Sequence, residues 1–92
     1  MTKVRASHIL VDSEAKAADL KKQIDGGASF EDLAKKNSSC PSGKDGGDLG
    51  WFGKGMMVKE FEQSCFSMNP GQVSAPVKTQ FGFHLIKLTE AK

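Results

Sequence analysis

A glycine-rich stretch from Ser38 to Gly55 holds more than half of the chain's 10 glycines and divides the sequence into two parts. Glycine loses the most backbone freedom on folding and so disfavours helix and strand interiors, which predicts a loop here. Leu49, Trp51 and Phe52 are interspersed among the glycines, whereas a flexible linker would carry serine repeats. We therefore expect an ordered, functional loop that contains a short strand at Leu49–Phe52, with the regular elements on either side of it.

The residues before this loop predict one strand and two helices. Apolar residues recur with a period of two in Val4–Val11, which indicates a strand and turns His8 toward its apolar face. That face comprises Val4, Ala6, His8 and Leu10. Asp12-Ser13-Glu14 supplies an N-cap and an acidic first turn for a helix that ends at Gly26-Gly27. Ser29 and Asp32 then match a capping box, and this second helix closes at Lys35-Lys36-Asn37.

The residues after the loop predict a third helix and two strands. Met57, Phe61 and Cys65 recur at helical spacing around a helix from Val58 to Phe66, which a turn at Met68–Gly71 ends. Extended runs follow at Val73–Lys78 and Phe83–Leu88, joined by a hairpin connection at Thr79–Gly82. Pro76 lacks an N–H group and places the first run at a sheet edge. The element order predicts an α+β domain with a small, mainly antiparallel sheet.

Length and charge limit the classes of protein to consider. A chain of 92 residues closes one apolar core but not two, so we expect a single domain over residues 1–92. The 13 basic and 11 acidic residues are interspersed, and a net charge of +2 indicates neither a nucleic-acid nor a membrane partner. We expect a monomer. The apolar run Ile9–Val11 is too short for a signal peptide or a membrane span, which favours a cytoplasmic location.

The cysteines and histidines predict no metal centre. Cys40 and Cys65 lie far apart and form no CxxC motif, so we expect free thiols. With His8 and His84 they make a nominal zinc ligand set, but the paired close spacings of zinc modules are missing. We therefore expect no metal and no cofactor.

Several segments together carry a resemblance to a known family. They are Ala6–Val11, Phe30–Ala34, Gly46–Gly50, Met57–Phe61, Val73–Val77 and Phe81–Ile86, in that order. Through them the chain resembles, over essentially its full length, the parvulin-type peptidyl-prolyl cis/trans isomerases, and among these the small bacterial-type members. The resemblance implies an FKBP-like superfold, with a four-stranded, mainly antiparallel sheet and about four helices. It also implies an enzyme that rotates X-Pro bonds, assists protein folding and needs no cofactor.

The resemblance further implies which residues form the site. The polar positions that match the family's catalytic network are His8, Cys40, Thr79 and His84. The positions that would bind substrate are Leu49, Met57, Phe61, Gln80 and Phe81, with the first three holding the proline ring. Read from the residue pattern alone, Met57 and Phe61 are more typical of the core face of a helix, and the resemblance is what favours the pocket. The histidines either orient the pocket floor or transfer protons, and we favour the first role.

The resemblance also bears on the substrate. Phosphate-directed members of the family carry Arg and Lys after the first strand, where this chain has Asp12 and Glu14, and two carboxylates repel phosphate. We therefore expect unphosphorylated polypeptides with an apolar residue before proline. Trp51, Phe81 and Phe83 are the candidates to line that subsite, and Lys16 and Lys44 are the only nearby basic residues.

Two other classes of function stay open at this point. The first is a non-catalytic peptide-binding or chaperone module on the same scaffold. The second is a thiol redox or metal-binding protein, which the cysteine spacing disfavours. The lysines of the first two helices are most simply explained as solvated surface, and they are Lys21, Lys22, Lys35 and Lys36.

Overall fold

The protein is described from a computed structural model, which covers residues 2–92; Met1, the first residue of the predicted domain, lies outside them. Its elements in chain order are β1 (Lys3–Val11), α1 (Glu14–Asp25), α2 (Phe30–Asn37), the 3₁₀-helix η1 (Pro41–Asp45), β2 (Asp48–Gly53), α3 (Lys59–Ser67), β3 (Val77–Thr79) and β4 (Gly82–Ala91). The strands form one sheet in the order β2-β1-β4-β3, and every neighbouring pair is antiparallel. The predicted α+β class and four-stranded antiparallel sheet are confirmed.

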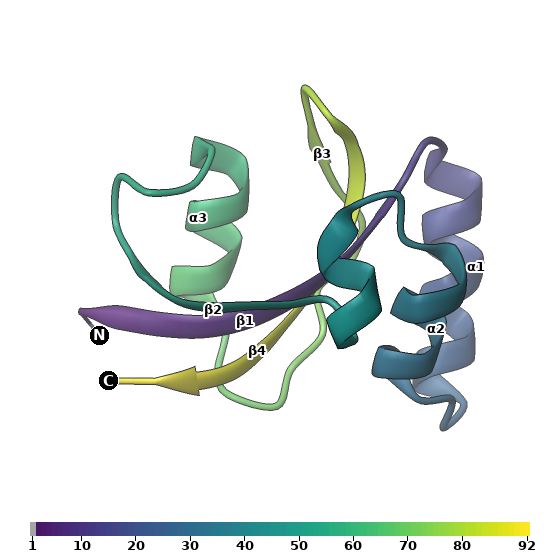
Figure 1. The fold of residues 1–92 in the computed structure, drawn as a ribbon, viewed down its shortest axis with the longest axis horizontal. Coiled ribbons are helices and arrows are strands. Elements are labelled where there is room, and N and C mark those ends of the chain that lie inside the picture. Colours follow the sequence, from purple (N-terminus) through teal and green to yellow (C-terminus); the bar gives the residue numbers. More distant parts are fainter. Residues whose placement is uncertain (1) are drawn as a thin grey trace.

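The helices cover the two faces of the sheet separately (Figure 1). In this view α3 lies over the left part of the strands, whereas α1 and α2 lie together at the right. Odd-numbered residues such as Ile9 of β1 and Leu85 of β4 pack under α1 and α2, in a cluster that also includes Phe30. Even-numbered residues such as Ile86 of β4 pack under α3, in a cluster that also includes Phe61. The sheet therefore has two apolar faces, one for each group of helices.

The caps expected from the sequence begin α1 and α2. Ser13 Oγ accepts a hydrogen bond from the Lys16 amide at 3.1 Å, and Ser29 Oγ accepts one from the Asp32 amide at 3.2 Å. Each serine satisfies an N–H group that the first helical turn leaves unpaired. The α2 cap holds Phe30 at the first helical position, where the ring is buried against the sheet. No helix among residues 2–92 is long and apolar enough to cross a bilayer.

The glycine-rich stretch is more regular than the sequence predicted. It contains η1, which was expected to be loop, and β2 extends one residue beyond the predicted strand at each end. Gly47 explains the close fit of this stretch to the sheet, because a Cβ there would lie 2.3 Å from the His8 carbonyl oxygen. Its carbonyl accepts the His8 amide at 3.0 Å. The three α-helices and η1 together account for the expectation of about four helices.

The prediction for the strand at Val73–Lys78 was wrong in extent. Val73 makes only an isolated bridge to Lys87, and β3 itself is three residues long. Pro76 stands just before β3 and cannot donate to a ladder, which accounts for the interruption. The predicted position of this strand at the sheet edge is confirmed, since β3 is the outermost strand beside β4. Thr79 belongs to β3 and not to the connection, and the turn is shorter than predicted.

The two ends of the described chain lie side by side (Figure 1). The Lys3 amide donates to the Lys92 carbonyl at 3.0 Å, and the Lys92 amide donates back to Lys3 at 2.9 Å. Lys92 thus continues the pairing between β1 and β4 to the last residue.

Candidate functional site

Two histidines face each other on the central strands, beneath α3. Leu10 of β1 is the register partner of His84 on β4, so His8 lies diagonally across from His84 on the same face. The two Nδ1 atoms are 2.9 Å apart, and the rings are stacked at an interplanar angle of 20°. Both side chains are buried. The predicted pairing of these histidines across the sheet is what the structure contains.

Thr79 extends this pair into a hydrogen-bonded chain. Its Oγ1 lies 2.7 Å from His84 Nε2 and accepts the Phe81 amide at 3.1 Å. Because one Nδ1 must donate and the other accept, two arrangements of the protons satisfy the chain. In both of them His8 Nε2 stays without a partner, and it is the one buried side-chain nitrogen or oxygen without a hydrogen bond among residues 2–92.

Burial keeps both imidazoles neutral. Burial, and to a smaller extent the neighbouring His84, lowers the pKa of His8 to about 4. Burial likewise lowers the pKa of His84 below its usual value. Desolvation disfavours the charged form of a base, and a second base at hydrogen-bond distance adds to that cost. Near pH 7 the pair therefore provides neutral hydrogen-bonding groups.

An apolar cleft of about 260 Å³ opens directly above the histidines. Its lining residues are His8, Leu10, Cys40, Leu49, Met57, Val58, Phe61, Phe81 and His84. Phe61 of α3 meets both imidazoles edge-on, with ring centroids 5.6 Å from His8 and 5.5 Å from His84. Aromatic edges on ring faces are a favourable geometry. Phe61 therefore serves both the core under α3, where it is 3% exposed, and the floor of the cleft.

Cys40 stands at the rim of this cleft, just before η1. Its Sγ accepts a hydrogen bond from Ser42 Oγ at 3.3 Å, and within residues 2–92 no hydrogen bond joins it to either histidine. A cysteine that acts as a nucleophile needs a base within hydrogen-bonding distance. Cys65 is different, because it is fully buried under α3 and burial raises the pKa of its thiol to about 12. Both cysteines are free thiols, as expected.

Some of the predicted lining residues lie elsewhere. Phe83 alternates with His84 on β4 and packs in the cluster under α1 and α2, so its predicted place in the substrate subsite was wrong. Trp51 alternates with buried Phe52 on β2, is absent from the cleft lining and lies under the Lys92 ammonium group at 4.6 Å. Gln80 is exposed in the turn between β3 and β4 and does not line the cleft.

Two lining residues were not assigned to the site from the sequence. Leu10 had been placed on the His8 face of its strand, and the period of two was the signal that would have found it. Val58 precedes the first turn of α3 without a capping side chain, and no local pattern distinguishes it from a core residue.

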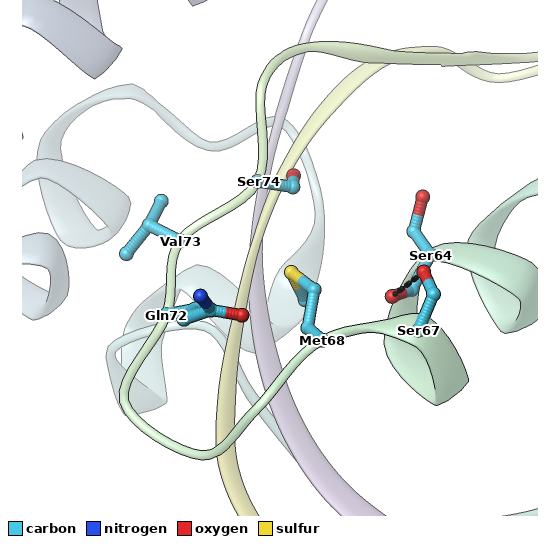
Figure 2. Close-up of a pocket in the computed structure, with 6 residues that line it drawn as sticks. All are labelled: Ser64, Ser67, Met68, Gln72, Val73 and Ser74. Carbon is cyan, nitrogen blue, oxygen red and sulfur yellow. Dashed lines mark hydrogen bonds between the residues drawn. The ribbon is translucent and has the colours of Figure 1, made fainter.

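A second concavity lies at the other end of α3 (Figure 2). It is formed by Ser64, Ser67, Met68, Gln72, Val73 and Ser74, and Figure 2 shows the Val73 side chain pointing away from the helix. No histidine, cysteine or charged side chain lines it, so its serine hydroxyls have no acid or base among the lining residues to activate them. Among residues 2–92 no cluster of three or more potential metal ligands is present. Titratable groups instead line the cleft and a cavity next to it, which contains Cys40, Lys35 and Lys44.

Comparison with known proteins agrees with this geometry. Residues 1–92 match the family described as the PPIC-type PPIASE domain. The foldase protein PrsA of Geobacillus sp. strain WCH70 is 54% identical over 89 residues, which cover 96% of this chain and 32% of that protein. The chain therefore spans about a third of the length of such curated relatives.

Two solved structures share the fold closely. The crystal structure of the peptidylprolyl isomerase PrsA from Bacillus anthracis superposes with a TM-score of 0.97 at 48% identity, over 99% of this chain and 42% of that one. The solution structure of NmPin, the parvuline of Nitrosopumilus maritimus, superposes with a TM-score of 0.88 at 42% identity and covers 98% of both chains.

Proposed function

Because the chain belongs to the family of PPIC-type peptidyl-prolyl isomerase domains, the parvulins, we propose that its cleft rotates X-Pro bonds in polypeptides and so assists their folding. The observation that carries this proposal is the apolar cleft closed at its base by two neutral imidazoles and Phe61. It combines a slot for a pyrrolidine ring with a few polar atoms at one side of it.

The energetic demand on such a site is modest. Amide resonance gives the X-Pro bond a rotational barrier of about 20 kcal/mol, and lowering it by about 5–7 kcal/mol accelerates rotation roughly 10⁴- to 10⁵-fold. The twisted amide has lost resonance and much of its carbonyl polarity, so an apolar environment favours it over the planar amide that water solvates. Leu49, Met57 and Phe61 supply that environment. No covalent intermediate is required.

The polar residues fit a positioning role. His8 and His84 are hydrogen-bonded to each other at 2.9 Å, and His84 is hydrogen-bonded to Thr79 at 2.7 Å, which fixes the rings against Phe61. In this hydrogen-bonded network only His8 Nε2 lacks a partner within residues 2–92, and such a network holds the cleft floor in a defined shape. Cys40 places a polarisable thiol at the rim, where we expect it to face the substrate carbonyl, and no hydrogen bond within residues 2–92 joins it to a base.

The cleft also supports a preference among substrates. Phe81 is 62% exposed at the rim and, with Leu10, offers an apolar surface for the residue before proline. Asp12 and Glu14 follow β1 and would repel a phosphate there. Unphosphorylated polypeptides with an apolar residue before proline are therefore the proposed substrates, acted on by a monomeric domain.

The test is a measurement of cis/trans exchange by NMR on peptides with leucine or phosphoserine before proline. We expect faster exchange on the leucine peptide and little on the phosphoserine peptide. Phe61→Leu should abolish most of this rate. Phe30→Leu is its matched control, since both rings are 3% exposed but Phe30 packs under α1 and α2.

Each alternative outcome has a definite meaning. Peptide binding without faster exchange would make the domain a peptide-holding module and would contradict the proposed catalysis. An equal loss of activity in both variants would show that Phe61 acts through stability alone.

A further inference from the structure

Another cavity, distinct from the concavity of Figure 2, adjoins the apolar cleft and shares Cys40 with it. Its volume is about 360 Å³, and it is lined by Lys35, Ser38, Ser39, Cys40, Pro41, Gly43 and Lys44. It differs from the cleft in chemistry, because two ammonium groups and two hydroxyls replace the aromatic and aliphatic side chains. No acidic side chain lines it.

The cavity is formed by the packing of η1 against the end of α2. Gly43 permits this contact, since a Cβ there would lie 2.9 Å from the Ala34 carbonyl oxygen and 3.1 Å from Ser38 Cβ. The close approach brings Lys44 of η1 and Lys35 of α2 to one opening.

The hydrogen-bonding groups of the wall point to an acceptor as ligand. Ser38 Oγ accepts the amides of Leu10 and Cys40 at 3.1 Å and 3.3 Å, which fixes its position. A hydroxyl also carries one donor hydrogen, and no acceptor for it occurs within residues 2–92. Lys35 and Lys44 are likewise without an ion pair in that part of the chain.

Two carboxylates near the cavity are paired with other residues. Glu31 of α2 pairs with Lys87 at 3.1 Å, and Asp48 of β2 pairs with Arg5 at 2.6 Å. Asp45 follows Lys44 but does not line the cavity. The opening therefore presents positive charge and hydrogen-bond donors that have no partner of their own.

We propose that this cavity is an anion subsite for a glutamate or aspartate side chain of the polypeptide whose proline occupies the cleft. The inference rests on the proposed function and adds a substrate class to it. Cys40 lines both the cleft and the cavity, and an extended chain advances about 3.3 Å per residue, so a side chain up to three positions from the proline lies within about 10 Å of it, on the scale of two adjoining cavities. Two lysines acting as point charges can hold a carboxylate or a phosphate, and the carboxylates of Asp12 and Glu14, which follow β1, disfavour the more highly charged phosphate.

The experiment compares peptides that carry glutamate or glutamine at each of the three positions on either side of a leucine-proline pair. The readout is the ratio of kcat/KM for the glutamate peptide to that for the glutamine peptide, at low and high salt. At one position or more we expect a ratio of roughly 3 to 10, as for one or two exposed ion pairs. The ratio should approach one at about 1 M salt, where screening acts within about 3 Å.

Two double variants with the same change in net charge localise the effect. Lys35→Gln with Lys44→Gln should bring the ratio to about one. Lys22→Gln with Lys36→Gln removes two lysines outside the cavity, one on each of α1 and α2, and should leave the ratio unchanged. A ratio near one at all six positions, or an equal drop in both double variants, would overturn the proposal.

Binding separates failure of the subsite from failure of the proposed function. If no peptide is turned over, the isomerase proposal fails, and NMR titration still decides the subsite. Tighter binding of the glutamate peptide that is lost only in the Lys35/Lys44 variant would support it, and equal binding of both peptides would overturn it. A phosphoserine peptide that binds or reacts better than the glutamate peptide would overturn the assignment to a carboxylate.

Discussion

The two faces of the sheet are built from the same two strands, yet they differ in chemistry. Under α1 and α2, the core cluster consists of apolar side chains such as Ile9 and Leu85. Under α3, the same strands contribute His8 and His84 next to Ile86, and the core opens into a cleft. Burying polar groups costs free energy unless they are paired, so the second face gives up stability for a defined polar floor. The first face provides the stability that this requires.

The largest expected effect comes from a substitution in the core cluster under α1 and α2. Leu85→Ala removes a fully buried side chain from the cluster under α1 and α2, and we expect a loss of about 2–5 kcal/mol in the free energy of unfolding. The isomerase rate per folded molecule should stay close to that of the parent. Denaturant titration and NMR exchange measure the two quantities. A strong drop in rate with unchanged stability would contradict the division between the faces.

The next effect concerns pH and belongs to the second face. An unfolded histidine has its ordinary pKa of about 6.5, whereas burial lowers that of folded His8 to about 4. The unfolded state then binds more protons, so the stability that is complete above pH 6.5 is lost as the pH falls toward 4. We expect unfolding to become easier by about 2 kcal/mol between pH 7 and pH 5.

The matching control is His8→Gln, in which the dependence of the unfolding free energy on pH over this range should be much flatter. An equally steep dependence in the variant would assign the effect to other groups.

A smaller effect is expected from the hydrogen bond that orients His84. Thr79→Val keeps the shape of the side chain but removes the group that lies 2.7 Å from Nε2, which should cost about 1–2 kcal/mol of stability and lower the rate. Thr89→Val is the control, because the Thr89 hydroxyl bonds to the Arg5 carbonyl at 2.8 Å and is outside the cleft lining. Equal losses of rate in both variants would contradict a role for Thr79 in the site.

The smallest effect should come from Cys40. Removing an enzyme's nucleophile costs up to roughly 10⁶ in kcat, whereas Cys40→Ala should lower kcat/KM by less than about tenfold, because twisting an amide needs no covalent bond. Steady-state exchange rates on the leucine-proline peptide measure this. A loss of more than about a thousandfold in a variant that is still folded would indicate that Cys40 acts as a nucleophile.

The sequence predicts the first face better than the second. Serine caps and apolar spacing place α1 and α2 correctly, because those signals are local. The facing histidines follow from the period of two on two strands together with the family resemblance. Their 2.9 Å contact depends on the register between β1 and β4, which no local pattern specifies.

Other features escape the sequence for physical reasons that can be stated. The η1 helix could not be predicted from the sequence, because the glycines in and around it disfavour a helix. Packing of Gly43 against Ala34, and not helix propensity, stabilises it. Phe83 was assigned to the cleft although strand alternation places it opposite His84. The cytoplasmic location and the monomeric state stay predictions of the sequence.

The pairing of Lys3 with Lys92 has a consequence for how this domain is joined to other polypeptide. Entry and exit coincide, so the unit can be spliced into a surface loop of a host protein without forcing the flanking segments apart. A domain inserted in this way leaves the fold of its host unchanged. A force that pulls the two ends apart would separate β1 from β4, beginning at the pair Lys3 and Lys92. The hydrogen bonds between the two strands would then break one after another.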